Sequence, residues 1–463
     1  MTLHPRCLRF SGQAVFRIGF TAAWAGFAAG CAGYEANQLP LQPALVGTVA
    51  ALDRARPGGG QIPAEQPLTL ADVGLLAVRN SPDLKAVRAR HGVAQAQVIQ
   101  AGLLPDPVLA GSYGVLLAGP DFANAFSASL TADIAALVTL SARREAASKA
   151  AQQVDANVVW QEWQTMRQAQ TLVIDIVEQG RLLRSLEQTL GLLQKRAATT
   201  AGGVAQGNAT LQMLAPDVAA VTSLQTQLDI AALTQERRWQ SLDALLGLEP
   251  WVRPQLATDF LVPELSETEI AAMLRSLPER RPDLIALQLG YASQEAKLRA
   301  AVLGQFPALT LGPNYASDTA RVQTIGPAVT VGLPIFNRNR GAIAIERATR
   351  EQLRAEYEAR LATAAGGARA LLANIALLTK QLRAARAGLG QSRMLAANAE
   401  GALRGGLLDE LSYVQLIVAR LEKERQVIGL EQQLLDERTA LATLLGAGLP
   451  PVRLVTPKQA SLL

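Results

Sequence analysis

The feature that most constrains this chain is an internal repeat with a spacing of about 200 residues. The stretch "SPDLKAVRAR" begins at Ser81, and "RPDLIALQLG" begins at Arg281. Identical residues recur at a spacing of 200 as far as Leu309, and Gly207 and Gly406 lie 199 residues apart. Solenoid units are much shorter, at roughly 20 to 50 residues. The repeat therefore indicates two similar halves of one assembly.

The first 30 residues have the composition of an export signal. Arg6, Arg9 and Arg17 accompany the apolar run "IGFTAAWAGFAAG", which closes on small residues before Cys31. We therefore expect residues 1–30 to be a signal peptide. Its removal takes three arginines from a formal net charge of +5. The basic balance thus predicts no nucleic-acid partner.

Cysteine and histidine are too few for the common disulfide and metal chemistry. The chain has two of each, and Cys7 and His4 lie in the leader. No disulfide can form within one mature chain, and a site of His and Cys ligands has almost no residues to use. The sequence shows no Walker-type phosphate loop, no acid pair in a pocket-forming context and no nucleophile with a histidine base. We expect no enzyme, no metal site and no cofactor.

The remainder of the chain divides into a linker, two repeats and a tail. Residues 31–67 are rich in Pro and Gly and lack periodicity, which predicts an extended linker. The repeats are expected at 68–263 and 264–450, and an irregular tail at 451–463. Each repeat follows one plan: a short helix, a middle helix, two short strands and two long helices.

Alternation of apolar with small polar residues predicts two strands in each repeat. They are expected at about 108–117, 122–134, 307–316 and 322–334. Leu130 and Val329 belong to the apolar register, and Ser129 and Thr330 to the polar one. Strands of about ten residues with one apolar face fit a tilted crossing of a bilayer, although a half-buried soluble sheet alternates in the same way.

A membrane reading of these strands requires several chains. Four strands cannot enclose a lumen, because closure takes roughly eight or more. No apolar run of about 18 residues follows the leader, so a bilayer crossing is expected to use strands and not a helix.

The segments that follow the strands predict unusually long helices. Residues 141–198 and 342–403 contain no proline, and at about 1.5 Å per residue each stretch would extend about 90 Å. Leucines at steps of three and four indicate coiled-coil seams. Both helices break at glycines, in 199–208 and 401–410, and a second helix returns from each break. These breaks are the predicted tips of two helical hairpins.

Taken together, these features resemble the TolC-type outer-membrane efflux protein family, whose members are also called outer membrane factors. The stretch "GPAVTVGLPIFNRNRGAI", in which a strand ends in Pro-Ile-Phe and leads into a basic helix start, is similar to the family's strand-to-helix junction. The ending "FAAGC" resembles a lipoprotein signal, which would make Cys31 a lipidated N-terminus. Ordinary cleavage that leaves Cys31 as a plain thiol is the alternative.

The resemblance implies a mainly α fold with a small β part and a homotrimeric assembly. Three chains with four strands each would form a twelve-stranded barrel in outer-membrane lipid, continued by an α-helical tunnel in the periplasm. The implied function is a passive exit duct of a tripartite efflux system. Its implied partners are a periplasmic adaptor (membrane fusion) protein and an inner-membrane pump, with the RND type as one option.

Several transport classes stay open at this point. Drugs, heavy-metal cations and proteins of type I secretion are alternative cargoes, because the pump largely sets the substrate. From a different class of protein, a lipid-anchored helical scaffold in the periplasm is the rival interpretation.

The resemblance also implies roles for the hairpin tips. It places adaptor docking on Gly202, Gly203, Gly207, Gly405, Gly406 and Leu407. It places a periplasmic gate at the start of the returning helix, where family members often carry two acids three residues apart. Here Asp409 fills the first position and Ser412 the second, and Thr210 stands opposite Asp409 in the first half. Asp409 would equally stabilise its helix as an acid in the first turn.

Overall fold

A computed structural model describes residues 34–118, 123–259, 262, 264–452 and 454. The chain divides after Ala44 into two units. Residues 34–44 contain no helix or strand, and all the elements below belong to the unit that begins at Leu45. The predicted signal peptide, Cys31 and nearly all of the predicted tail after Val452 lie outside the described residues.

The first repeat follows the expected order of elements. After η1 (Val49–Ala51), which lies in the predicted linker, these are in chain order α2 (Leu70–Asn80), α3 (Pro82–Gly102), β1 (Val108–Gly114), β2 (Ala125–Asp133), α4 (Ala135–Ala205) and α5 (Leu211–Leu246). A capping box of Thr69 and Asp72 begins α2. Pro82 begins α3 at the position where its missing N–H would have no partner inside the helix.

The second repeat contains the same plan with one extra turn of helix. Its elements are α6 (Glu267–Arg275), α7 (Leu277–Arg280), α8 (Pro282–Leu303), β3 (Ala308–Ser317), β4 (Gln323–Gly332), α9 (Arg340–Arg404) and α10 (Glu410–Leu445). The returning helices α5 and α10 have the same length, 36 residues each. Pro282 again begins its helix.

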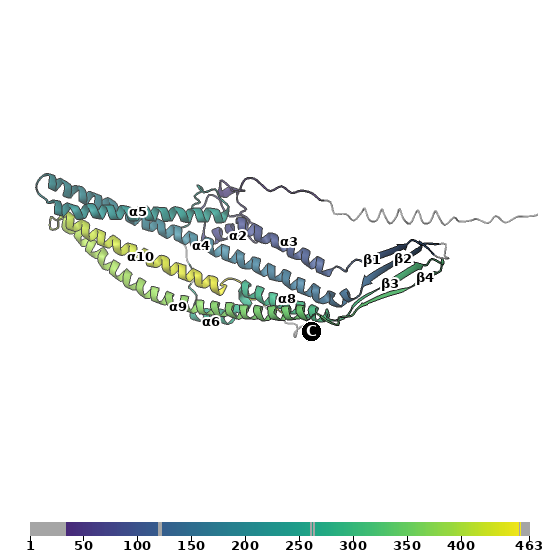
Figure 1. The fold of residues 1–463 in the computed structure, drawn as a ribbon. Helices are drawn as coiled ribbons and strands as arrows, with labels where there is room; N and C mark the ends of the chain where they lie inside the picture. The colour runs from purple at the N-terminus through teal and green to yellow at the C-terminus, as the bar shows by residue number, and fades with distance from the viewer. Residues whose placement is uncertain (1–33, 119–122, 260–261, 263, 453, 455–463) are drawn as a thin grey trace, which may run out of the picture. The chain divides into compact units, whose positions relative to one another are not determined.

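The long helices exceed the lengths expected from sequence. α4 has 71 residues and α9 has 65, so at about 1.5 Å per residue they extend about 105 and 100 Å. α4 is longer than predicted at both ends. Residues 199–205 continue the helix into the first predicted tip, and residues 135–140 extend its start, where the backbone N–H of Ala136 donates to the Asp133 carboxylate at 3.1 Å. Figure 1 shows both hairpins, α4 with α5 and α9 with α10, as long antiparallel pairs.

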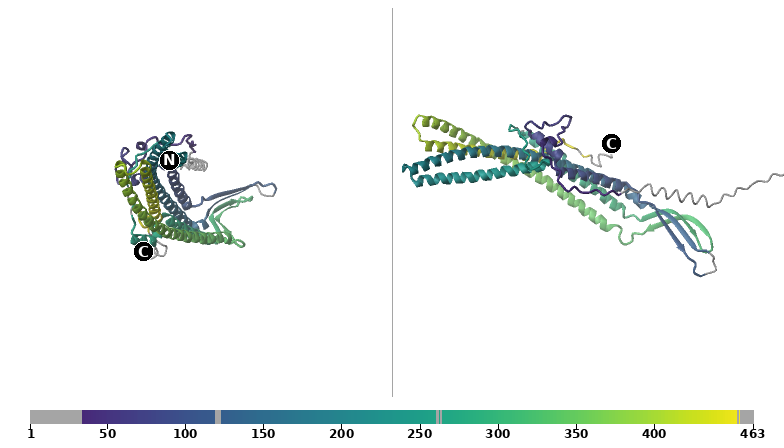
Figure 2. Two further views of the ribbon diagram at one scale, coloured as in Figure 1. Left: turned by 90° about the vertical axis from the view of Figure 1, so that its left-hand side faces the viewer. Right: turned by 90° about the horizontal axis from the view of Figure 1, so that it is seen from above.

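The hairpins pack along each other, and α4 lies at the centre of the helical layer. α4 contacts α2, α3, α5, α8 and α10, whereas α9 contacts α8 and α10. Figure 2 shows the two hairpins side by side in both further views. The predicted leucine seam is present inside the first hairpin, where Leu186, Leu190 and Leu193 of α4 pack with Leu224 of α5.

Each repeat has its own hydrophobic core at the base of its hairpin. Leu242 and Leu246 belong to one core, and Leu441 and Leu445, each 199 residues later, belong to the other. Both returning helices then end on a left-handed glycine, Gly247 or Gly446. The sequence repeat is therefore also a repeat of packing.

The four strands form one antiparallel sheet in the order β1-β2-β3-β4. The central pair, β2 with β3, joins the two repeats. β1 and β4 are the edges, and β1 ends at Gly114, before the predicted boundary near 117.

One property of α9 departs from the expectation that no helix is apolar enough to cross a membrane. An 18-residue window of α9 reaches a mean hydropathy of 1.5, so by length and composition this helix would qualify. Only 11% of that window is buried. The expectation was based on uninterrupted apolar runs. The mean hydropathy of a window can stay high when a charged residue interrupts the run, as it does in this alanine-rich helix.

Candidate functional site

The register of the sheet places its larger apolar side chains on one face, except for Val108, which pairs with Thr131 on the other. Residues that pair directly across antiparallel strands point to the same side. Leu109 pairs with Leu130, Leu311 pairs with Val329, and Leu309 pairs with Val331. The complete face consists of Leu109, Gly111, Tyr113, Phe126, Ala128, Leu130, Ala132, Leu309, Leu311, Pro313, Tyr315, Ser317, Gln323, Ile325, Pro327, Val329 and Val331.

The opposite face of the sheet carries small and hydroxyl side chains. Ser112 pairs with Ser127, and their hydroxyl oxygens lie 2.8 Å apart. Thr310 pairs with Thr330, and Asn314 pairs with Gly326. A sheet with one apolar and one polar face suits a boundary between lipid and a water-filled lumen.

The apolar face has no covering layer within the described part of the chain. Ile325 is 81% exposed and Val329 is 57% exposed. The rings of Phe126 and Tyr315 lie 6.3 Å apart on this face. In a soluble sheet these side chains would face a core, so their exposure fits a surface that faces lipid.

The two hairpin tips have the same backbone geometry. Gly207 and Gly406 adopt φ values of +75° and +71°, and the residue after each donates to a carbonyl five residues back, at 2.8 Å. This αL ending satisfies the last carbonyls of the long helices, and glycine is the residue that adopts it without a steric penalty. Gly202, Gly203 and Gly405 have negative φ, so backbone conformation does not require glycine at these three positions.

The start of the returning helix differs between the tips. The Asp409 carboxylate caps α10, because it accepts from the Ser412 backbone N–H at 2.8 Å and from the Ser412 hydroxyl at 2.7 Å. These hydrogen bonds hold the pKa of Asp409 below its usual value. Thr210, at the start of α5, makes no such side-chain bond. The two predicted gate residues therefore meet each other in one cap.

A polar seam that the sequence analysis missed joins α4 to α10. Gln432 of α10 donates to the Asp175 carboxylate of α4 at 2.5 Å, and Arg181 of α4 bridges Glu178 and Glu431 at 2.7 and 3.0 Å. Such residues are ordinary for an exposed helix face, so no sequence signal identifies the seam.

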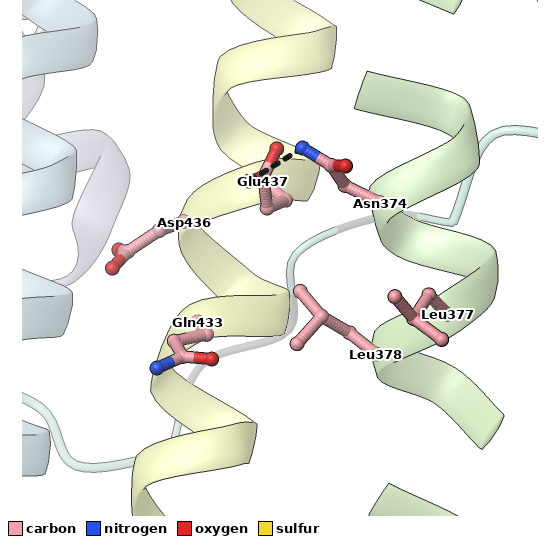
Figure 3. A pocket seen from close by; sticks show the side chains of 6 residues that line it. All are labelled: Asn374, Leu377, Leu378, Gln433, Asp436 and Glu437. Atoms are coloured by element: carbon pink, nitrogen blue, oxygen red, sulfur yellow. Dashed lines mark hydrogen bonds between the residues drawn. The ribbon is translucent and has the colours of Figure 1, made fainter. Parts of the chain in front are cut away.

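Asp436 of α10 is the titratable group of this seam. Burial, and then the negative charge of Asp175, raise the pKa of Asp436 to about 7. In Figure 3 its carboxylate points away from Leu377 and Leu378 of α9, whereas Glu437 turns toward Asn374. These side chains line a groove of about 350 Å³ between α9 and α10.

Metal-binding clusters are not found in the part of the chain that the structure describes. No group of three or more His, Cys, Asp or Glu residues there could hold an ion. His91, the only histidine after the leader, is exposed and lies 2.5 Å from the Asp155 carboxylate.

Comparisons with known proteins show what this chain is similar to. The family model for outer membrane efflux proteins matches residues 273–447, which covers most of the second repeat. The pyoverdine export outer membrane protein OpmQ of Pseudomonas putida is 27% identical over 412 residues, which are 81% of this chain and 84% of OpmQ. OpmQ of Pseudomonas aeruginosa is 29% identical over 66% of this chain and 70% of its own.

The second repeat matches the outer membrane efflux protein family, and the chain as a whole is similar to export proteins of the outer membrane. Solved structures agree on the fold. The Campylobacter jejuni outer membrane channel CmeC superposes with a TM-score of 0.67 at 16% identity, over 85% of this chain and 88% of CmeC. The Vibrio cholerae outer membrane protein VceC gives 0.66 at 18% identity, over 82% and 97%.

Similarity to outer membrane efflux proteins gives the exposed apolar face its environment. This protein is an outer-membrane efflux duct that extends into the periplasm. The predicted fold class, long helical hairpins with a small four-stranded sheet, is confirmed. The roles predicted for the tips, the gate and Cys31 stay predictions.

Proposed function

We propose that three copies of this chain close one twelve-stranded barrel and form the exit duct of a tripartite efflux system. The observation that carries this proposal is the sheet register, which gives each chain one apolar face and two unpaired edges, β1 and β4. Unpaired edges invite pairing with another chain, and four strands are too few to close. Three chains give a number of strands that can enclose a lumen.

Cross-linking between the edges tests the assembly. Within one sheet β1 and β4 are three strand spacings apart, about 14 Å, so a disulfide between them must join two chains. In a Cys31→Ser background, Ser112→Cys on β1 is combined with a cysteine at Thr324, Gly326, Ala328 or Thr330 on β4. One register should give a covalent trimer in outer-membrane extracts. Uncross-linked monomers at all four registers would contradict the shared barrel.

The hairpin tips are the proposed docking site for a periplasmic adaptor protein. At these tips Leu407 is 86% exposed and Leu211 is 72% exposed, and exposed apolar residues at a loop suit a protein contact. The docking residues are Gly202, Gly203, Gly207, Gly405, Gly406 and Leu407. A photo-cross-linker at position 407 should capture an adaptor protein, whereas one at Gln225, partway along α5, should not.

Asp409 is the proposed gate residue, with Ser412 as its partner. Three symmetry-related carboxylates around one axis would concentrate negative potential at the periplasmic entrance. This role is compatible with the cap on α10, since the cap uses lone pairs of the carboxylate and leaves its charge in place.

The proposed cargo is a small exported molecule such as a siderophore, delivered by an inner-membrane pump. Support comes from the similarity to the OpmQ proteins, which are named for pyoverdine export. A strain without this chain should retain siderophore in the periplasm and release less into the medium. Unchanged siderophore release would contradict a siderophore cargo. Lost tolerance to drugs or metal ions in the same strain would indicate that those molecules are the cargo.

Cys31 is the proposed site of lipid attachment. The support is the sequence "FAAGC" and the proline- and glycine-rich stretch behind it. Cys31→Ser should abolish labelling by a radioactive fatty acid and slow maturation. Equal labelling of the variant would remove the acyl anchor from this account.

A further inference from the structure

The apolar face of the sheet leads into a groove at the end where the strands join the helices. This groove of about 370 Å³ lies between the β2–α4 and α8–β3 junctions. Ile134, Val138, Leu303, Phe306 and Leu309 supply much of its lining. Leu309 also belongs to the apolar face, so the groove is continuous with the surface that faces lipid.

The groove is open to its surroundings and apolar. Phe306 is 62% exposed and Val138 is 48% exposed. A cavity of a few hundred cubic ångströms with apolar walls is of a size that takes part of an organic ligand. A segment of acyl chain would cover these side chains.

One cationic side chain lines the same groove. Arg143 is exposed, and its guanidinium donates to the carbonyl of Ala136 at 2.9 Å without an ion pair to any carboxylate in the described chain. The acid of the groove, Asp133, already accepts the backbone N–H of Ala136 at 3.1 Å. Arg143 therefore has donors left for an anion.

Two further arginines are neighbours in sequence of Asn339, which lies beside the groove. The Asn339 side chain donates to the carbonyl of Ala301 at 2.7 Å and approaches Gly304, which lines the groove. Its neighbours Arg338 and Arg340 are exposed. At the opposite end of the strands, the β3–β4 turn instead combines one acid with one base, Asp318 and Arg321.

We propose that this groove binds an anionic phospholipid of the inner leaflet, with an acyl chain along its apolar wall and the phosphate at Arg143. The proposal rests on the outer-membrane placement of the strands. A ligand with both an apolar chain and an anionic head satisfies the wall and the arginine together, and continuity with the lipid-facing sheet makes a membrane lipid its source. Arginine near a membrane surface favours anionic lipid by about 1 kcal/mol, which is about fivefold in binding.

Native mass spectrometry of the delipidated full-length protein tests the proposal. Dioleoyl phosphatidylglycerol should be retained about fivefold more than dioleoyl phosphatidylcholine. Arg143→Gln should remove this preference, and Arg143→Lys should keep most of it. Arg321→Gln is the matched control, because it removes an exposed arginine at the other end of the strands, and it should bind like the wild type.

Three results would overturn the proposal. They are an unchanged preference in Arg143→Gln, equal retention of the two lipids by the wild type, and full competition by inorganic phosphate, which would make this a simple anion site. Val138→Trp offers a second approach, because it fills the groove and should lower retention of both lipids. Single-channel conductance of the same preparations tests the proposed duct separately from the lipid site. Each variant should still conduct, even where lipid binding is lost.

Discussion

The two repeats share one sequence plan, but their long helices have different surroundings. α4 packs against five other helices and buries 17 of its residues, whereas α9 packs against two helices and buries 7. The sequence period alone would make the two helices equivalent. The comparison teaches that duplication alone does not give the two repeats the same surroundings. Within one chain the long helix of the first repeat lies at the centre of the helical layer, and that of the second repeat lies at its edge.

The same contrast appears in the residues that flank α10. Asp175 and Glu178 of α4 form the polar seam on one side of α10, whereas their counterparts 199 residues later in α9 are Asn374 and Leu377. Figure 3 shows α10 with Asp436 directed away from the α9 side. Equivalent positions have therefore diverged in charge according to the neighbour they meet.

The largest expected effect tests whether the two faces of the sheet differ in the same way in both repeats. Leu130→Arg and Val329→Arg place a charge on the lipid-facing register of β2 and β4, and each should cost about 2–4 kcal/mol near the bilayer midplane. Ser129→Arg and Thr330→Arg on the polar face should be milder. Folding yields and unfolding in lipid vesicles measure the difference. Equal losses on both faces would exclude the barrel.

The tips should respond to substitution in parallel. Alanine at Gly207 or Gly406 meets no atom within 4 Å, so its cost is that of the left-handed backbone, about 1–2 kcal/mol. Thermal unfolding should show equal losses for the two variants. Gly191→Ala inside α4 is the control and should stabilise the protein by about 0.5–1 kcal/mol. A much larger loss at one tip would show that the two turns are not equivalent.

A smaller, pH-dependent effect is expected at the seam between α4 and α10. Four charged groups surround Asp436: Asp175 and Glu178 of α4, Arg238 of α5, and Glu437, which follows Asp436 in α10. Its pKa is raised to about 7, so the packed seam favours the neutral acid. This stability is present at acid pH and is lost as the pH rises through about 7. The seam should be tighter at pH 6 than at pH 8.

Hydrogen exchange of α10 measures this dependence. Asp436→Asn should hold the protection of α10, after correction for the intrinsic pH dependence of amide exchange, near its acid-pH level at both pH values, because the amide stays neutral. Asp229→Asn, which changes an exposed acid on α5, is the control and should keep the wild-type slope. Persistence of the slope in Asp436→Asn would assign it to another group.

The smallest structural effect is expected at Asp409, where the two tips differ. Asn is also a good N-cap residue, so Asp409→Asn should leave the melting temperature almost unchanged. As a gate residue it should nevertheless weaken the block by divalent cations added from the periplasmic side in single-channel recordings. Block at wild-type strength would leave Asp409 as a capping residue alone. Thr210→Asn in the first repeat is the matched control and should leave the block unaltered.

Much of the fold could be predicted because it rests on local patterns. Pro82 and Pro282 indicate two helix starts, and alternation in β2, β3 and β4 indicates two-faced strands. Clean alternation is lacking in β1, and its end at Gly114 was placed too late. The start of α4 was placed too late as well, because the Asp133 carboxylate that supports its first turn belongs to the preceding strand.

The functional surfaces were predictable to a lesser extent. Gly207 and Gly406 could be found because a left-handed turn favours one residue type. The seam at Asp436 and the groove at Arg143 could not, because each is built from helices and strands that are distant in sequence. Their residues are ordinary for exposed helices, so only proximity makes them a site.

The sequence by itself determined the repeat, the two-faced strands, the long hairpins and their glycine turns. These features depend on periodicity and on the backbone preferences of single residues, which act over a few neighbouring positions. The tertiary structure alone decided which repeat lies at the centre, that the four apolar stripes align on one face of one sheet, and that Asp436 meets Asp175. Those outcomes depend on the pairing of β2 with β3 and on helix packing between segments more than 100 residues apart, which no local pattern encodes.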